Sequence, residues 1–397
     1  MSMAARRAFH TCRGSRMGQR IESPTGAFEA AELIAGAVAD GQRIEIIGGG
    51  SKRGYGGPAP GADLTLWTAR LGGILHYDPQ EMVLTAGAGE KLSAIDALLA
   101  EHNQMLGFEP PDFGAAFGGE AGETTLGGVL AANLSGPRRI ASGAARDHFL
   151  GFEAVSGKGQ IFKAGGKVFK NVTGFDLPKL MAGSWGTLAL LTEVTVKVVP
   201  KPKTTTTVIL RGASFQNATG AMTRAMGQPL AVSGAVMLPT LKGTQTAFRL
   251  EGFGPSVEVR AERLAAQLEP FGEVEVRDAA FSENFWRDIG RVAPLASEPG
   301  SLWRLSVPPA TGLDVVRAVD GAAAWIADWA GGLVWVLAAP DATLDLPAIA
   351  AAVGGSALKV RGEVSEVSRQ PAHAALSGLV RAAFDPHGVF ASRAMVA

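Results

Sequence analysis

Glycine is concentrated at two places in the chain, and both adjoin predicted strands. The first is a turn at 46–57, IIGGGSKRGYGG, which directly follows an apolar run. The second lies within 124–193, where TTLGGVLAANLSGPRR is followed by GAARDH and FKNVTGFDLPKLMAGSWGTLALLTE. Glycine serves where a backbone takes a positive φ or approaches a ligand closely. Two such regions predict a large ligand bound along the main chain, as a long phosphate-containing cofactor would be.

The first turn matches neither of the common glycine motifs for nucleotides. A dinucleotide fingerprint would need a third glycine where Arg53 stands, and a P-loop would need a Gly-Lys-Ser/Thr ending. Successive backbone N–H groups can still form a nest for a pyrophosphate, with Ser51 and Lys52 adding a hydroxyl and a charge. A tight connection between two strands would use the same glycines, so the turn alone leaves both interpretations open.

The second glycine region contains a predicted helix start. Residues 125–128 can begin a helix whose free N–H groups face an anion. Asn133 and Gly136 add polar edges and close backbone approach, and residues 183–187 provide a further contact before a strand. The competing interpretation is a glycine-rich packing seam between strands.

Composition narrows the class of protein. The 397 residues are 47% hydrophobic, and Lys+Arg and Asp+Glu both number 37, so nothing overall favours nucleic acid or an anionic membrane. The single cysteine, Cys12, excludes an intrachain disulfide framework and a thiolate metal cluster. Residues 1–20 hold five arginines and no acid, which predicts a disordered basic extension, with a targeting arm as the alternative. With one cysteine, a cytoplasmic location is expected.

The most apolar stretch is 321–340, GAAAWIADWAGGLVWVLAAP, which Asp328 and a Gly-Gly pair interrupt. A spanning helix needs about 20 uninterrupted apolar residues, so no transmembrane segment is predicted. A helix, a turn and a strand at 333–337 are predicted instead. The helix would carry on one face Val315, Val319, Ala322, Ile326 and Trp329.

The pattern of predicted strands and helices changes after Pro200-Lys201-Pro202. Residues 205–277 follow the order strand–helix–strand–strand–helix–strand, which is typical of a ferredoxin-like α+β layer. A second, weaker set of this kind runs from 302 to 360, and a last helix is predicted over 371–384. The fold class is therefore α+β, with a domain boundary near residue 203.

The order of the motifs resembles the vanillyl-alcohol-oxidase-type (PCMH-type) FAD-binding domain. It comprises the glycine turn, a Pro-Pro segment, T-x-G-G-x-x-A-x-N-x-x-G and K-N-x-x-G-x-D-L-x-x-L-x-x-G-S-x-G-T-L. More closely, residues 40–203 resemble the FAD-binding E subunits of bacterial glycolate oxidases, through the segments 86–89, 104–111, 125–147 and 165–202. The C-terminal half matches more loosely, through FWR, LWRL and FDPHG.

This resemblance implies a two-subdomain PCMH-type FAD-binding domain over 21–203 and a ferredoxin-like α+β cap domain over 204–370. A C-terminal helix and tail, 371–397, would return to the FAD domain. FAD would be noncovalent, because relatives that attach flavin covalently place a histidine where Ser-Lys-Arg stands here. The implied FAD contacts are Gly48, Gly49, Gly50, Ser51, Lys52 and Gly54 for the pyrophosphate, Pro111, Thr125, Leu126, Gly127, Gly128, Asn133 and Gly136 for the flavin and ribityl chain, and Gly183, Gly186, Thr187 and Glu193 at the far side.

Catalytic residues are less defined by the sequence. Arginine suits a carboxylate clamp, and Arg287, Arg304 and Arg369 are candidates, with surface or interface roles as the alternative. A cation near flavin N1 raises its potential, for which the candidates are Arg138, Arg139, Arg146 and Lys170. The six histidines form no metal-binding pattern, so no metal site is expected, and His148 is expected to be structural.

The resemblance implies an FAD-binding subunit of a multi-subunit glycolate (2-hydroxy acid) oxidase or dehydrogenase. Glycolate would be oxidised to glyoxylate, and electrons would pass to an iron–sulfur partner, since one cysteine cannot hold a cluster. The expected partners are a homologous FAD-binding catalytic subunit and the iron–sulfur subunit, without nucleic acid. Two alternatives stay open, namely a self-sufficient flavin-dependent D-2-hydroxy-acid dehydrogenase and a non-catalytic FAD-binding scaffold.

Overall fold

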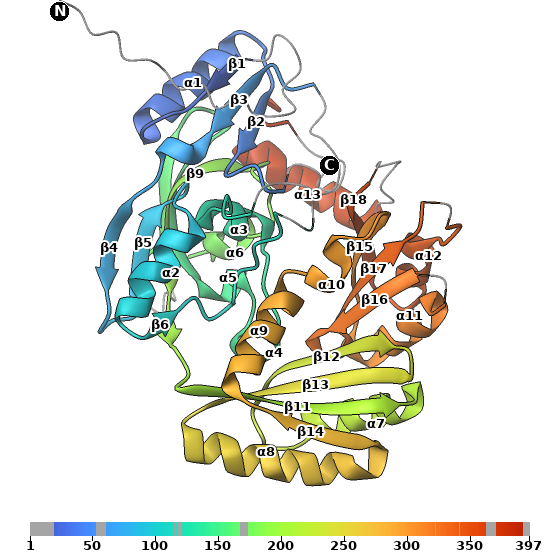
Figure 1. The fold of residues 1–397 in the computed structure, drawn as a ribbon. Coiled ribbons are helices and arrows are strands. Elements are labelled where there is room, and N and C mark those ends of the chain that lie inside the picture. The colour runs from blue at the N-terminus through green and yellow to red at the C-terminus, as the bar shows by residue number, and fades with distance from the viewer. Residues whose placement is uncertain are drawn as a thin grey trace, which may run out of the picture.

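The computed structural model describes residues 20–52, 61–114, 116, 121–166, 174–321, 323–340, 342–362 and 371–391, with backbone only at 371–374. Two small sheets and one large sheet organise most of the chain (Figure 1). The N-terminal half occupies the top and left of the view, and the larger sheet lies at the lower right.

The N-terminal half is built on two sheets. The first is parallel, in the order β1-β3-β2, and α1 covers it through Ala30, Ile34 and Ala37. The second is antiparallel, in the order β4-β5-β9-β7-β8. The strands are β1 (Arg20–Glu22), β2 (Ile44–Ile47), β3 (Leu64–Trp67), β4 (Ile74–Asp78), β5 (Val83–Gly87), β7 (Phe149–Ser156), β8 (Ile161–Gly165) and β9 (Ala189–Lys197), with the short pair β6 (Gln104–Met105) and β10 (Val199–Pro200).

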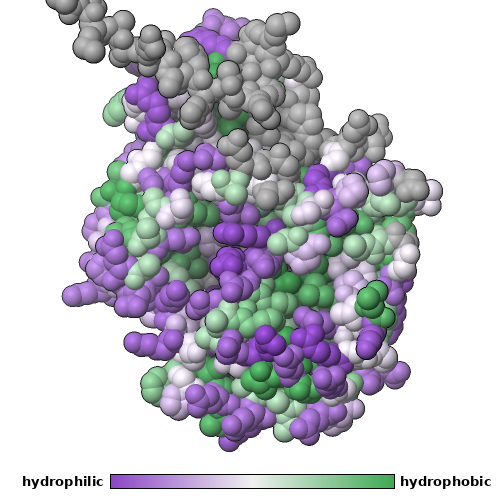
Figure 2. Space-filling view, viewed as in Figure 1, coloured by the Kyte–Doolittle hydropathy of each residue, from purple (hydrophilic) through white to green (hydrophobic). Residues whose placement is uncertain are grey.

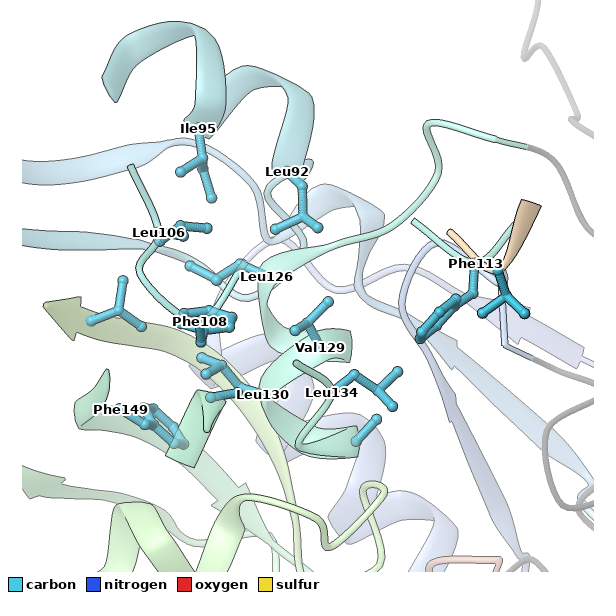
Figure 3. Packing of buried hydrophobic residues seen from close by; sticks show 14 of the residues in the cluster. Leu92, Ile95, Leu106, Phe108, Phe113, Leu126, Val129, Leu130, Leu134 and Phe149 are labelled. Atoms are coloured by element: carbon cyan, nitrogen blue, oxygen red, sulfur yellow. The ribbon is translucent and has the colours of Figure 1, made fainter. Parts of the chain in front are cut away.

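Helices pack against both of these sheets. They are α1 (Ala27–Ala39), α2 (Leu92–Glu101), α3 (Leu126–Ala132), α4 (Arg139–Ser142), α5 (Ala145–His148) and α6 (Leu177–Met181). Leu126, Val129 and Leu130 of α3 point into a core that also contains Leu92 and Phe108 (Figure 3). The apolar spacing of α2 and α3 thus has the expected result, a buried face on each helix.

The C-terminal half carries an eight-stranded sheet in the order β14-β11-β13-β12-β16-β17-β15-β18. Each half of this sheet is one strand–helix–strand–strand–helix–strand unit, so both ferredoxin-like sets predicted from the sequence are confirmed. The first unit comprises β11 (Thr204–Ala213), α7 (Phe215–Met226), β12 (Val232–Thr240), β13 (Gly243–Gly252), α8 (Gly254–Leu268) and β14 (Glu273–Arg277). The second comprises β15 (Ser301–Ser306), α11 (Gly312–Val319), β16 (Ala323–Asp328), β17 (Leu333–Ala338), α12 (Leu346–Ala352) and β18 (Ser356–Arg361).

We call this eight-stranded part, residues 204–362, the cap. Its two units meet at β12 and β16, through the pair Met237 and Ala327. Between them, α9 (Ala279–Gly290) and α10 (Ala293–Ala296) lie against the N-terminal half. The last helix, α13 (Pro371–Phe384), leads to residues that pair with β2, since Ile44 N donates to Val389 O at 2.7 Å. The exact domain limits proposed from the sequence stay predictions.

One predicted element is wrong. The helix expected to run as far as Trp329 ends at Val319, and Ala323–Asp328 is strand β16 instead. Trp325, Ile326 and Ala327 are buried on both faces of a central strand, so the run lacks polar alternation and imitates a helix face. Among the helices that the structure describes, none has the length and apolarity that crossing a membrane requires.

One hydrophobic core joins the two halves. It includes Leu126 and Phe108 of the N-terminal half together with Trp286, Trp329 and Trp335 of the cap. The face seen in Figure 2 carries hydrophilic and hydrophobic residues in small neighbouring areas, in keeping with the balanced charge. The mixed α+β fold class is confirmed.

Candidate functional site

A pocket opens where the glycine turn after β2 meets α3 and the end of the 183–187 turn. Its empty space is about 740 Å³, the open mouth included. We call it the glycine pocket. Its walls include Gly48, Gly49, Gly50, Ser51, Lys52, Thr125, Gly127, Gly128, Ala131, Trp185, Gly186 and Leu191.

The glycine turn contributes backbone donors to this pocket. Gly50 has a φ of 75°, which favours glycine. A Cβ at Gly49 would collide with the carbonyl oxygen of Glu123, and one at Gly48 would lie 2.6 Å from Thr125 Oγ1. No backbone N–H from Gly48 to Ser51 donates to another residue that the structure describes. The turn therefore suits the oxygens of a phosphate group.

The start of α3 differs from the prediction of free N–H groups. Leu126 N donates to Glu90 O and Gly127 N to Ala88 O, both at 2.9 Å, while Gly128 N donates to Thr125 Oγ1 at 3.3 Å. These amides are satisfied because α3 packs closely on the end of β5, where a Cβ at Gly127 would lie 2.6 Å from Ala88 O. Helix α3 gives the pocket a small, flat wall, and Leu126 itself points into the core (Figure 3).

Lys52 is the basic side chain of the pocket. Its Nζ donates to Ser51 Oγ at 3.0 Å, and burial lowers the pKa of the Lys52 ammonium to about 8, against the attraction of Asp112. Ser51 Oγ lies 3.2 Å from Thr124 Oγ1, which donates to Asp112 Oδ1 at 2.9 Å. Asp112 also accepts from Gly122 N at 2.7 Å. Lys52 is thus mostly charged at neutral pH, and above pH 8 or so an entering anion would draw a proton onto it.

The turn before β9 forms another wall. Trp185 has a φ of 55° between Gly183 and Gly186, whose φ values are 88° and 75°, and its N donates to Ala131 O at 2.9 Å. Trp185 and Gly186 line the pocket, whereas Thr187 is buried and donates to Ser184 O. The sequence prediction omitted Trp185, although a large aromatic between two glycines of one turn was a usable signal.

Several predicted contacts do not line the glycine pocket. Asn133 ends α3 with a φ of 50°, and its Oδ1 accepts from Arg146 N at 3.1 Å. Gly136 lies at the boundary with the cap, where its carbonyl accepts from Trp329 Nε1 at 3.0 Å. Glu193 lies within the five-stranded sheet, opposite Gly87 and Glu153. Gly54, Lys170 and Arg369 lie outside the described residues.

A second hollow, which we call the α9 cleft, lies on the other side of Asp112 and Thr124. Pro110 and Pro111 form one wall, and α2 another. Arg287, a predicted carboxylate clamp, lines the cleft together with Arg291, one helical turn further along. The sequence prediction omitted Arg291. Two guanidinium groups spaced in this way could hold a small carboxylate, beside the carboxylates of Asp96, Glu109 and Asp112 that also line the cleft.

The other predicted arginines serve different contacts. Arg139 and Arg304 lie over the ring of Trp329, with Cζ at 4.2 and 5.2 Å from its centroid. Burial, with the nearby Arg304, lowers the pKa of Arg139. Arg138 pairs with Glu251, and Arg146 lies 3.7 Å from Asp147.

Comparison with known proteins identifies the cofactor. Residues 19–165 match the FAD binding domain family. The chain is 36% identical over 306 residues to glycolate oxidase subunit GlcE of Escherichia coli, covering 77% of this chain and 79% of the relative. The chain belongs to the GlcE family. Members of this family are FAD-binding oxidoreductases, so the prediction of an FAD-dependent oxidoreductase is confirmed.

Other relatives place the GlcE-family chain in a wider group. Glycolate oxidase subunit GlcD of Bacillus subtilis is 32% identical over 195 residues, 49% of this chain and 39% of GlcD. D-2-hydroxyglutarate dehydrogenase of Xanthomonas citri pv. viticola is 25% identical over 291 residues, 67% of this chain and 56% of the relative. An alkyldihydroxyacetonephosphate synthase structure superimposes with a TM-score of 0.68 at 15% identity, over 93% of this chain and 75% of that one, which shows the fold.

The glycine pocket of this GlcE-family chain fits part of FAD. The N–H groups of Gly48 to Ser51 and the Lys52 ammonium would hold a pyrophosphate, and the small surfaces of Gly127 and Gly128 leave room beside it. No group of three or more His, Cys, Asp or Glu residues able to hold a metal occurs in the described ranges. His148 is buried, and its Nε2 lies 2.8 Å from Ser142 O, which fits a structural role.

Proposed function

We propose that this chain is the FAD-carrying subunit of a multi-subunit glycolate oxidase or dehydrogenase. The observation that carries the proposal is the glycine pocket, found in a chain that GlcE of Escherichia coli matches over 79% of its own length. The cofactor is noncovalent in this proposal, since Ser51 and Lys52 stand in the first turn.

Gly48–Lys52 would hold the pyrophosphate of the cofactor. Pro111, Asn133 and Gly136, which do not line the glycine pocket, would lie near the ring end, on the side of the cap. FAD supplies an acceptor for two electrons and the hydrogen of the oxidised carbon. The protein's own part is to hold the ring, exclude water and orient the substrate carboxylate. Arg287 and Arg291 of the α9 cleft hold that carboxylate, with Arg304 and Arg139 at Trp329 as the alternative clamp.

Electrons leave through another chain. Glycolate gives up two electrons and two protons to become glyoxylate, and the electrons pass to an iron–sulfur partner. The single cysteine of this chain cannot bind such a cluster. A homologous FAD-binding subunit related to GlcD completes the complex, and the expected location is cytoplasmic, or peripheral to the inner membrane through these partners.

Anaerobic addition of glycolate to the purified FAD-loaded chain tests the proposal. We expect the visible flavin absorbance to bleach rapidly only when the partner subunits are present. Bleaching of the chain alone would favour the self-sufficient dehydrogenase. If the complex still bleaches at the same rate after FAD has been removed from this chain and left on the partner subunit, the scaffold alternative is correct.

A paired substitution tests the clamp. Arg287→Met should raise the glycolate concentration needed for half-maximal bleaching on the order of 10–100-fold, because a charge-assisted pair is lost. Arg317→Met is the matched control, since Arg317 is exposed on α11 and contacts only Asp314 among the ion pairs of the described residues. Equal behaviour of the two variants would reject Arg287 and favour Arg304.

A further inference from the structure

The boundary between the N-terminal half and the cap contains five charged side chains that are largely buried. They are Glu109 and Arg138 of the N-terminal half and Arg249, Glu251 and Asp328 of the cap. Arg249 is 2% exposed, and it donates to both carboxylate oxygens of Glu109, at 2.8 and 3.0 Å. We call this group the boundary network.

The network closes on itself through Arg138. The Arg138 guanidinium pairs with Glu251, its backbone N donates to Glu109 Oε2 at 2.8 Å, and Glu251 lies 3.7 Å from Arg249 Nε. Burial raises the pKa of Asp328 to about 7, against the effects of the Trp329 N–H and Arg249. When Asp328 is protonated, the two arginines of the network face two carboxylates, those of Glu109 and Glu251.

Glu109 occupies a special backbone position. Its φ is 50°, in the left-handed region that non-glycine residues rarely adopt. Its N donates to Leu106 O at 3.0 Å, and its carbonyl lies so close to Gly136 that a Cβ there would collide with it. Residue 109 sets the direction in which Pro110 and Pro111 leave, and Arg249 holds its carboxylate from the cap.

The cap holds the N-terminal half at a second point. Trp329 and Ala330 have φ values of 53° and 54°, and Asp328 Oδ1 accepts from Trp329 N at 2.7 Å. This turn directs the indole so that Nε1 donates to Gly136 O at 3.0 Å. The cap therefore holds both Glu109 and Gly136, the two segments at the expected ring end of the cofactor.

We propose that Arg249 and Trp329 are positioning residues for the ring end of the FAD site, acting from the cap through Glu109 and Gly136 without touching the cofactor. The inference rests on the proposed placement of the ring near Pro111 and Gly136. A buried ion pair is weak evidence for stability, because desolvation offsets its attraction. A role in fixing one geometry explains why such a network is placed here.

Two conservative substitutions test this inference on the FAD-loaded chain. Arg249→Lys keeps the charge but loses the two-pronged contact with Glu109. Trp329→Phe keeps an aromatic ring but loses the donor to Gly136, together with part of the ring surface under Arg139 and Arg304. We expect each variant to shift the flavin midpoint potential and the shape of its visible spectrum, and to weaken FAD binding on the order of tenfold.

The control is Arg211→Lys, which alters an ion pair with Glu275 in the cap, on strands β11 and β14. A lower unfolding temperature with unchanged potential, spectrum and FAD affinity in both variants would overturn the inference. If Arg249→Lys does not fold, Trp329→Phe alone decides. Failure of glycolate to reduce the flavin of the wild-type complex, with the partner subunits present, would reject the proposed function, whereas these readouts need no substrate.

Discussion

Ser51 Oγ lies 3.2 Å from Thr124 Oγ1, so two hydroxyl groups form part of the wall between the glycine pocket and the α9 cleft. Thr124 also donates to Asp112, which links the glycine turn at Ser51 to the segment after Pro111. The two hollows share a wall and cannot change shape independently.

Removal of the Thr124 hydroxyl should weaken FAD binding. Thr124→Val keeps the shape of the side chain but removes the hydroxyl that bonds to Asp112 and Ser51. Leaving these buried groups without that hydrogen-bond partner costs about 1–3 kcal/mol of free energy. We expect a dissociation constant about tenfold higher, measured by flavin fluorescence quenching. Thr85→Val is the matched control, because Thr85 Oγ1 makes a similar 2.9 Å contact with Thr195 inside the sheet. Equal loss in both variants would contradict a special role for Thr124.

Lys52 should make FAD binding depend on pH. The pKa of its ammonium is lowered to about 8 in the protein without cofactor, and a bound pyrophosphate raises it again. Binding therefore takes up a proton above pH 8 or so, and affinity should fall as pH rises from about 7 to about 9. Calorimetry in two buffers of different ionisation enthalpy measures the proton uptake.

Variants of Lys52 separate charge from shape. Lys52→Arg stays protonated throughout this range, so its affinity should be nearly constant. Lys52→Gln should bind weakly at every pH. An unchanged pH profile in Lys52→Gln would place the responsible group elsewhere.

The glycine turn should not tolerate a methyl group at residue 49. Gly49→Ala drives its Cβ into the carbonyl of Glu123, which is backbone and cannot move aside. We expect loss of bound FAD on purification and a cost on the order of 3 kcal/mol in the free energy of unfolding. Gly36→Ala in α1 meets no atom within 4 Å and should be neutral or stabilising. A yellow, stable Gly49→Ala protein would contradict this close approach of the turn to Glu123.

Asp328 should make stability fall with rising pH. Its pKa of about 7 in the folded protein exceeds the ordinary 3.8, so the folded state binds the extra proton between these values. The contribution is complete below pH 3.8 and is lost as pH rises through 7, by at most about 1.4 kcal/mol per pH unit. Asp328→Asn should reduce this slope in urea unfolding. A slope identical to the wild type would show that Asp328 ionises normally.

Sequence reasoning succeeded where one segment determines its own structure. The buried faces of α2 and α3 and the first ferredoxin-like unit follow from local periodicity and turns, as does the second unit outside β16. It failed at Ala323–Asp328, because a strand buried on both faces lacks the alternation that marks a strand. The amides of Leu126 and Gly127 were expected to be free, but their acceptors lie on Glu90 and Ala88, and only the tertiary fold brings these together.

The boundary network was also beyond local reasoning. Arg249 and Glu109 are 140 residues apart, and nothing in either segment specifies the other. A charged residue inside the apolar strand around Phe248 was nevertheless a signal of a buried partner. The FAD cofactor was predicted from motif order, which carries information that single glycines do not.

The core shared by Phe108, Trp286 and Trp335 has a practical consequence for dissecting this molecule. The change of topology near residue 203 looks like a natural place to cut the gene. A fragment ending near residue 203 would expose to solvent the apolar surface that the cap tryptophans now cover. The cap by itself would expose the tryptophan rings. Topology divides this chain in two, but its packing does not, and its halves should unfold together.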